Sequence, residues 1–387
     1  MSETFRRLLP VYMLLLFRNT AWSLSVSGPV LPLYIRSLGI DIVDWSFIAT
    51  AHAVGLIVFE GLWGTISDRI DRNRMLVGAL ICMGLVFPFY TVKSLVPYFI
   101  VLQFAVGAFA VAIGPTTRAM VADGSPEESR GFYMSVWFTF FTLGSMIGPI
   151  LGIYIADLMG YEYAFYASAA VLLLGAAIFG VFFRGNSGKV APKERGAGSV
   201  WQDATTLLSV PSVTLIFMLT VSIFTGMPAV RAFLPIYAAE EVGMSNVSIG
   251  VMLTISSGLQ LVVMPVLGRL SDRFSRRLLI AAGLAGMFTM SMAFYLVETP
   301  LQLVLATTAI SIFGCVSSLV LATLSKVAPR ELSGMAMGMY GSFEDLGLII
   351  GPVIYGLIWN GYEPALIFPA AAVISLLGLV FLSRIRE

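Results

Sequence analysis

Charged and strongly polar side chains within long apolar segments are the residues of this sequence best suited to chemistry. Glu344 and Asp345 are neighbours in one such segment, and Arg18 and Asn19 are neighbours in another. A charge near the centre of a lipid bilayer costs at least ~2.5–3.5 kcal/mol, so it normally faces a polar cavity or a partner. Because burial favours the neutral form of a carboxyl group, one acid of the Glu344–Asp345 pair is expected to exchange a proton beside Arg18.

The alternative for these residues is a purely structural pair between Arg18 and one of the two acids. Successive helix residues differ by about 100° in direction, so only one of the acids can point squarely at a cavity. Arg231 lies in a third apolar segment. It is expected either to attract an anionic group or to pack between helices with its charge drawn to the membrane surface.

Three other ionisable residues lie within the apolar segments. His52, the single histidine of the chain, is expected to be a satisfied histidine of a membrane helix rather than a proton carrier. Arg118 is expected to form an ion pair near the inner end of its segment, and Glu60 to reach the membrane interface. Aromatic residues of these segments can line a lipophilic cavity or face lipid; they are Trp22, Trp137, Phe138, Phe140, Phe141 and Tyr340.

Long apolar segments must position all of these residues. Of the 387 residues, 58% are hydrophobic and only 12% are charged, whereas about a quarter of the residues in a soluble domain are charged. This composition excludes a disordered chain, a nucleic-acid-binding module and an ordinary soluble enzyme. A helix that crosses the bilayer needs ~20 apolar residues. Twelve segments of this kind lie at 10–35, 44–67, 75–93, 96–121, 131–157, 163–184, 211–237, 246–270, 277–297, 300–325, 335–360 and 364–384.

The basic residues predict how these segments are oriented. Of the 23 Lys and Arg residues, three fall within apolar segments away from the two residues at either end, namely Arg18, Arg118 and Arg231. If both termini are cytoplasmic, Arg36 and Lys93 lie outside and the remaining 18 lie inside. The positive-inside rule therefore predicts an integral, multi-pass protein of the plasma (inner) membrane with both termini in the cytoplasm.

A hydrophilic stretch divides the twelve segments six and six. Residues 185–210 are rich in Gly, Ser, Lys and Arg, which predicts a flexible cytoplasmic linker. The linker separates an N-terminal six-helix bundle, residues 1–184, from a C-terminal six-helix bundle, residues 211–387.

The two halves also repeat each other in sequence. Leu31-Pro32-Leu33-Tyr34 recurs 203 residues later as Leu234-Pro235-Ile236-Tyr237. The string at 64–74 recurs at 268–278, and the string at 144–152 recurs at 347–355. Three motifs in the same order at nearly constant spacing indicate an internal duplication.

The string after the second segment resembles the loop motif of the major facilitator superfamily, G-x-x-x-D-R-x-x-R. The motif is matched by Gly64, Asp68, Arg69 and Arg72, and again in the second half by Gly268, Asp272, Arg273 and Arg276. The first copy departs from the family pattern at Asp71 and Asn73. Because the motif occurs twice on the predicted cytoplasmic side, the resemblance to this family is specific.

This loop motif implies a conformational latch. By the family pattern, Asp68 faces the positive N-terminal end of a helix, and Arg72 pairs with Asp123. The alternative is an ordinary surface ion pair, worth ~0–1 kcal/mol. Lys326 occupies the position that matches Asp123 in the second half, so the second latch is expected to differ or to be absent.

A second string resembles the antiporter motif of the same family. Gly144, Gly148, Pro149 and Gly152 fit G-x-x-x-G-P-x-x-G, which is associated with drug–proton exporters. Close helix packing is the alternative, because Gly and Pro recur at 351–352 in the second half. A third motif, R-x-x-x-G, is only partly present, since Gln103 stands where the family has arginine.

The resemblance covers essentially the whole chain and implies an all-α membrane protein of 12 transmembrane helices in two pseudo-symmetric bundles. It implies a secondary active transporter that works by alternating access, with proton-coupled efflux of lipophilic or amphiphilic small molecules as the leading function. A uniporter or symporter for an organic anion, sugar or other polar solute is the alternative. The candidate cavity residues are Arg18, Asn19, Gln103, Arg231, Glu344 and Asp345.

Enzymatic activity is not expected. The sequence contains no nucleophile elbow, phosphate-binding loop or metal-ligand cluster, and Cys82 and Cys315 both lie within apolar segments. We therefore expect a monomer in the lipid bilayer that takes a small-molecule substrate and protons and has no cofactor, metal or nucleic-acid partner.

Overall fold

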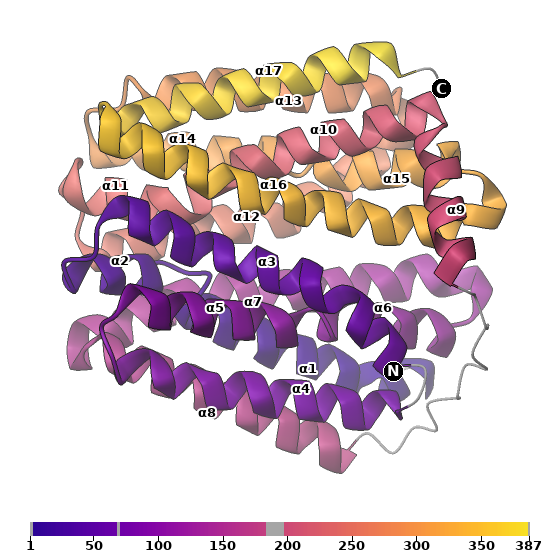
Figure 1. The fold of residues 1–387 in the computed structure, drawn as a ribbon, viewed down its shortest axis with the longest axis horizontal. Coiled ribbons are helices and arrows are strands. Elements are labelled where there is room, and N and C mark those ends of the chain that lie inside the picture. Colours follow the sequence, from indigo (N-terminus) through magenta and orange to yellow (C-terminus); the bar gives the residue numbers. More distant parts are fainter. Residues whose placement is uncertain (1–2, 68–69, 183–196, 386–387) are drawn as a thin grey trace. The chain divides into compact units, whose positions relative to one another are not determined.

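The computed structural model describes residues 3–67, 70–182 and 197–385. Helices joined by short connections make up this part of the chain (Figure 1). The helices form two compact units: unit 1 comprises Met1–Pro192 and Met244–Leu261, and unit 2 comprises Lys193–Gly243 and Val262–Glu387.

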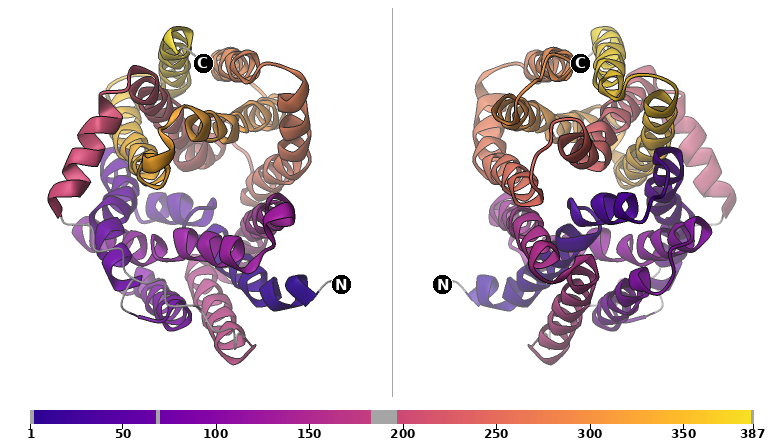
Figure 2. Two further views of the ribbon diagram at one scale, coloured as in Figure 1. Left: turned by 90° about the vertical axis from the view of Figure 1, so that its right-hand side faces the viewer. Right: turned by 90° about the vertical axis from the view of Figure 1, so that its left-hand side faces the viewer.

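Unit 1 is a bundle formed by the first half of the chain and one segment from the second half. Its helices are α1 (Glu3–Ser25), α2 (Val30–Ser37), α3 (Ile42–Ser67), α4 (Arg72–Val86), η1 (Phe87–Thr91), α5 (Val96–Ala110), α6 (Ile113–Gly124), η2 (Glu127–Ser129), α7 (Arg130–Met159) and α8 (Tyr161–Phe182). The N-terminal part of α12 (Asn246–Arg273) completes it. Figure 2 views the helices nearly end on, with the first half of the chain in indigo to magenta.

Unit 2 is built from the remaining helices. They are α9 (Ala197–Leu208), α10 (Pro211–Pro228), η3 (Ala229–Phe233), α11 (Leu234–Glu240), the C-terminal part of α12, α13 (Arg276–Phe294), α14 (Pro300–Gly314), α15 (Ser317–Val327), η4 (Arg330–Leu332), α16 (Ser333–Gly361), η5 (Pro364–Leu366) and α17 (Ile367–Arg384). In this unit α13 and α17 lie side by side, as do α10 and α16 (Figure 1).

Eleven helical segments of the described residues are long and apolar enough to cross a membrane. The first predicted segment, 10–35, is formed by α1 and α2 and does not reach the same hydropathy. Its lower hydropathy has a plain cause, because α1 contains Arg18, Asn19 and several hydroxyl side chains. The first span is therefore the most polar of its half.

The internal duplication extends to the packing of aromatic side chains in each unit. The equivalent residues are Tyr34, Tyr90 and Phe165 in unit 1, and Tyr237, Phe294 and Phe368 in unit 2. The ring of Phe165 lies 5.4 and 5.0 Å from those of Tyr34 and Tyr90. The ring of Phe368 lies 5.0 and 4.6 Å from those of Tyr237 and Phe294. Each unit thus contains a cluster of three aromatic rings at equivalent positions.

The second half of the predicted linker is helical. Residues Ala197–Leu208 form α9, and Leu207 is fully buried in the core of unit 2 with Val213, Ile216 and Leu382. The expectation of a flexible linker is therefore wrong for this segment, because an apolar side chain at the end of the helix fastens it to the unit that follows.

Candidate functional site

The first span of each half is interrupted at an equivalent place. In unit 1, α1 ends at Ser25 and α2 begins at Val30. In unit 2, a π-helical turn, η3, follows Pro228 and precedes α11. Interrupted spans at corresponding positions of two halves mark binding sites in membrane proteins, and π-helical turns are frequent at functional sites. The two breaks therefore direct attention to the polar residues around them.

Arg231 lies within the π-helical turn of unit 2 and is exposed. The carboxylate of Glu344, on α16, is close enough to stabilise its positive charge. Asp345 is the next residue of α16, and both acids are only partly buried. The structure therefore places two of the predicted cavity residues, Arg231 and Glu344, within electrostatic range of each other in one unit.

In unit 1, Arg18 and Asn19 are joined directly. Nη1 of Arg18 donates a hydrogen bond of 2.8 Å to Oδ1 of Asn19. The Asn19 side chain is fully buried, and its Nδ2 donates to the carbonyl of Leu15 at 2.9 Å. Asn19 therefore uses both ends of its amide to hold the Arg18 guanidinium against α1.

Gln103 lies beside His52, and His52 in turn contacts Trp22. The sequence did not predict that these residues lie together. The Gln103 side chain, on α5, is 3% exposed, and its Oε1 has no hydrogen-bond partner among the described residues. His52, on α3, lies against the backbone of Gln103, and the ring of Trp22 lies 4.5 Å from the imidazole. The expectation of a satisfied histidine is supported by a hydrogen bond between His52 and the backbone of Gln103, while Nδ1 of His52 makes no hydrogen bond that the described part shows.

The antiporter-like string packs α7 against α1. A Cβ atom on Gly144 would lie 2.8 Å from Cβ of Asn19, and one on Gly148 would lie 2.7 Å from the backbone nitrogen of Leu24. Gly152 meets the backbone of Leu24 equally closely, and Pro149 lies within α7. The structure thus places this string at a helix contact that only glycine permits.

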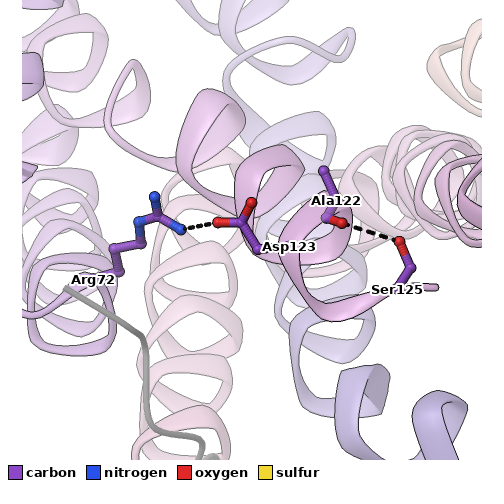
Figure 3. Close-up of polar contacts among 4 residues, drawn as sticks. All are labelled: Arg72, Ala122, Asp123 and Ser125. Carbon is purple, nitrogen blue, oxygen red and sulfur yellow. Dashed lines mark hydrogen bonds and ion pairs between the residues drawn. The ribbon is translucent and has the colours of Figure 1, made fainter. Parts of the chain in front are cut away.

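Arg72 and Asp123, which the loop motif paired, form an ion pair (Figure 3). Nη1 of Arg72, at the start of α4, donates to Oδ2 of Asp123 at 2.8 Å. Asp123 lies at the end of α6, where the hydroxyl of Ser125 donates to the carbonyl of Ala122 at 3.2 Å. Arg7 also donates to the carbonyl of Gly124. Two cations thus meet the negative C-terminal end of α6, as the helix dipole favours.

The departure of the motif at Asp71 has a structural cause. Oδ1 of Asp71 accepts hydrogen bonds from the backbone nitrogens of Asn73 and Arg74, at 2.9 and 3.3 Å, so Asp71 caps the N-terminus of α4. Ser275, the equivalent residue of the second half, caps α13 in the same way through the nitrogen of Leu278.

The second copy of the motif makes a different contact. Nη1 of Arg276 donates to the backbone carbonyl of Ala322 at 3.1 Å, in the middle of α15. A backbone carbonyl thus takes the place of the carboxylate in this contact, and a second latch that differs or is absent stays a prediction. Gly268, Asp272 and Arg273 lie at the exposed end of α12.

Some predicted contacts are not described. Gly64 lies in α3, whereas Asp68 and Arg69 lie outside the described residues. Arg18 belongs to unit 1 and both acids of α16 belong to unit 2, so their pairing stays a prediction. The guanidinium carbon of Arg118 lies 4.9 Å from the centre of the Trp137 ring, a cation–π contact that the sequence did not predict.

Comparison with known proteins places the whole chain in one family. The family model described as Major Facilitator Superfamily matches residues 13–352 and 216–387. The multidrug resistance protein MdtG of Enterobacter lignolyticus is 25% identical over 372 residues, which cover 94% of this chain and 88% of that protein. An uncharacterized MFS-type transporter of Methanocaldococcus jannaschii is 24% identical over 379 residues, covering 95% and 96%.

Solved structures share the fold at lower sequence identity. The nucleoside transporter NupG matches with a TM-score of 0.81 at 12% identity, over 98% of this chain and all of that chain (100%). A D-xylose–proton symporter matches with a TM-score of 0.79 at 16% identity, over 100% and 98% of the two chains. At these identities the likeness shows the fold alone.

Proposed function

The chain belongs to the major facilitator superfamily of transporters, and from this premise we propose that it exports lipophilic or amphiphilic small molecules in exchange for protons. Its similarity to multidrug resistance proteins over 94% of its length supports efflux. As a multi-pass membrane protein of this family it works by alternating access, as a monomer in the inner membrane with both termini in the cytoplasm.

The observation that carries the proposal is that Glu344 and Arg231, opposite charges on α16 and the π-helical turn, lie within electrostatic range of each other. Both residues lie inside apolar spans, where a charge is costly without a partner. When Glu344 takes up a proton, Arg231 loses the negative charge that stabilises it. Proton uptake at Glu344 therefore changes the charge beside the π-helical turn and couples protonation to the shape of the interrupted span.

The other candidate residues have supporting parts in this proposal. Asn19 and Gln103 are buried polar residues that support Arg18 and His52 in unit 1, and the ion pair between Arg72 and Asp123 acts as a latch that differs between the conformations of the cycle. Asp68, Arg69 and the second motif copy complete the latch. The glycine string on α7 lets α1 approach closely enough to place Asn19.

The test is transport into sealed vesicles that contain the purified protein. A panel of lipophilic cations, anions and neutral solutes is offered under an imposed pH gradient, and the solute that accumulates most is used further. Glu344→Gln is expected to abolish accumulation driven by the gradient while solute exchange at equal pH continues. Asp345→Asn, one residue away on the same helix, is the matched control and should accumulate solute as the native protein does.

The reverse pattern would assign the proton to Asp345. If both single variants and the double variant still concentrate the solute against its gradient, coupling does not use these acids, and the proposal of proton exchange at this site is wrong. Loss of equal-pH exchange in Glu344→Gln would assign the residue to solute binding instead.

A further inference from the structure

Arg18 is a cation without an anionic partner in its own unit. Its Nη1 donates to a neutral amide, that of Asn19, and its Nε is buried without a hydrogen-bond partner in the described part of the chain. Among the described residues of unit 1, no carboxylate forms an ion pair with it. Membrane helices rarely keep an arginine in this condition, because an unpaired charge at this depth is strongly unfavourable.

Helices of unit 1 near this arginine carry other polar atoms without hydrogen-bond partners among the described residues. The guanidinium carbon lies 5.5 Å from the centre of the Trp22 ring, and the same ring lies 4.5 Å from that of His52. Nδ1 of His52 and Oε1 of Gln103 are buried without partners among the described residues. Three helices, α1, α3 and α5, therefore bring unused hydrogen-bonding atoms to one region of unit 1.

The region is accessible in part. The side chains of Arg18, Trp22 and His52 are only half-buried, whereas Asn19 and Gln103 are buried behind them. The guanidinium of Arg18 and the indole ring of Trp22 lie next to each other in this region. This pairing suits a ligand with an anionic head and a flat apolar body.

We propose that Arg18 and Trp22 form a binding site for the carboxylate group and the adjoining apolar part of an amphiphilic organic anion. A guanidinium donates two parallel hydrogen bonds to a carboxylate, and an indole face packs against planar apolar groups. Asn19 fixes the guanidinium, and His52, with Gln103 behind it, holds the indole ring. These three are positioning residues.

This inference rests on the proposed function, because it takes the bound anion to be a transported solute. It names the solute class more narrowly, as carboxylates with an aromatic body. A binding measurement at equilibrium, with no pH gradient, separates the two ideas. A protein that binds the carboxylate without accumulating any solute refutes proton-driven export alone, and one that accumulates a solute without favouring the carboxylate refutes the binding site alone.

The experiment compares matched probes on the full chain in lipid nanodiscs by calorimetric titration. Naphthalene-2-carboxylate is compared with naphthalene-2-carboxamide, and indole-3-acetate with indole-3-acetamide. Each carboxylate is expected to bind about 10- to 100-fold more tightly than its amide, the range that a charge-assisted hydrogen bond provides. Arg18→Gln should abolish that preference, and Arg18→Lys should retain part of it.

Arg118→Gln is the control, because Arg118 also packs on a tryptophan, with 4.9 Å between its guanidinium carbon and the Trp137 ring. This variant should keep the preference for carboxylates. Trp22→Leu should weaken carboxylate and amide alike, since it removes the surface for the apolar body and leaves the cation in place.

Thermal unfolding without ligand distinguishes a binding arginine from a structural one. Because Arg18 has no anionic partner among the described residues of unit 1, Arg18→Met is expected to leave the unfolding temperature unchanged or to raise it. The proposal would be overturned if Arg18→Met lowered the unfolding temperature. It would also be overturned if the native protein bound each carboxylate and its amide with equal affinity.

Discussion

The ion pair between Arg72 and Asp123 is a contact between single residues that the loop motif implied and that the structure contains. Their nitrogen and oxygen atoms are 2.8 Å apart, and the side chains are 19% and 62% exposed. A pair this exposed adds ~0–1 kcal/mol to stability, which is little for a chain of this size. About 1 kcal/mol is nevertheless enough to change a conformational equilibrium roughly fivefold. The pair is therefore suited to biasing conformations rather than to holding the fold.

Removing one partner should reveal this difference. Asp123→Asn is expected to lower the transport turnover by about two- to fivefold and to leave the unfolding temperature nearly unchanged, because the pair is exposed. The double variant Arg72→Asp with Asp123→Arg should recover the turnover. Turnover in vesicles and thermal unfolding measure the two effects.

Glu127, an exposed acid in the loop that follows Asp123, supplies the control. Glu127→Gln should behave like the native protein in both measurements. Normal turnover in Asp123→Asn would refute the latch, and a large fall in its unfolding temperature would show that the pair is structural.

Interactions between single residues could be predicted from the sequence where a family motif implies which residues pair. The resemblance to the family implied the pair of Arg72 with Asp123, and apolar context alone identified Arg18, Arg231 and Glu344 as costly charges. Sequence reasoning gave no signal for the contact of His52 with Trp22. These residues are 30 positions apart on different helices, and only tertiary packing brings their rings together.

Two helix pairs of equivalent position show how glycine determines packing between elements. Gly144 and Gly148 of α7 lie against α1, and Gly347 and Gly351 of α16 lie against α10. A Cβ atom on Gly347 would lie 2.8 Å from the backbone nitrogen of Thr225. The close approach allows Ser23 Oγ to donate to the carbonyl of Gly144 at 3.1 Å. The glycines thus admit polar contacts that helices rarely make in lipid.

Enlarging one of these glycines should separate the helices. Gly148→Ala is expected to destabilise the protein by ~1–3 kcal/mol, since the added methyl group meets backbone atoms that cannot move aside. Thermal unfolding of the purified protein measures the change. Gly131→Ala, in the same helix but with open space around the position, should be neutral or stabilising. Equal stability of the two variants would contradict the packing argument.

The helices themselves were largely predictable, because each is a long apolar segment and hydropathy reports that directly. The breaks within them were not. The π-helical turn at Ala229–Phe233 and the gap between Ser25 and Val30 interrupt segments that read as continuous. Helix α9 was also missed, since its polar composition resembles a linker and its one fully buried anchor, Leu207, is evident only from the packing.

At the scale of the molecule, the two halves share their scaffold but not their charges. The aromatic triads, the glycine contacts and the caps at Asp71 and Ser275 recur at offsets of 203 or 204 residues. The ionisable residues inside the spans do not recur: the positions equivalent to Arg18 and Glu344 are Val221 and Phe141. Duplication therefore accounts for the shared architecture. The charged residues that occur in one half only, such as Arg18 and Glu344, are the ones that give each half different functional groups.

The distribution of basic residues also makes a prediction about the whole molecule, namely its orientation. Eighteen Lys and Arg residues lie in loops predicted to be cytoplasmic, and only Arg36 and Lys93 lie on the other side. Lys93 and Lys326 are both exposed, on opposite predicted sides of the membrane. In a variant with Cys82 and Cys315 replaced by alanine, a cysteine at Lys93 should react in intact cells with a thiol reagent that cannot cross the membrane. A cysteine at Lys326 should react only after the cells are made permeable. The reversed pattern would place both termini outside, contrary to the positive-inside rule, and would turn proton-driven export at Glu344 into import.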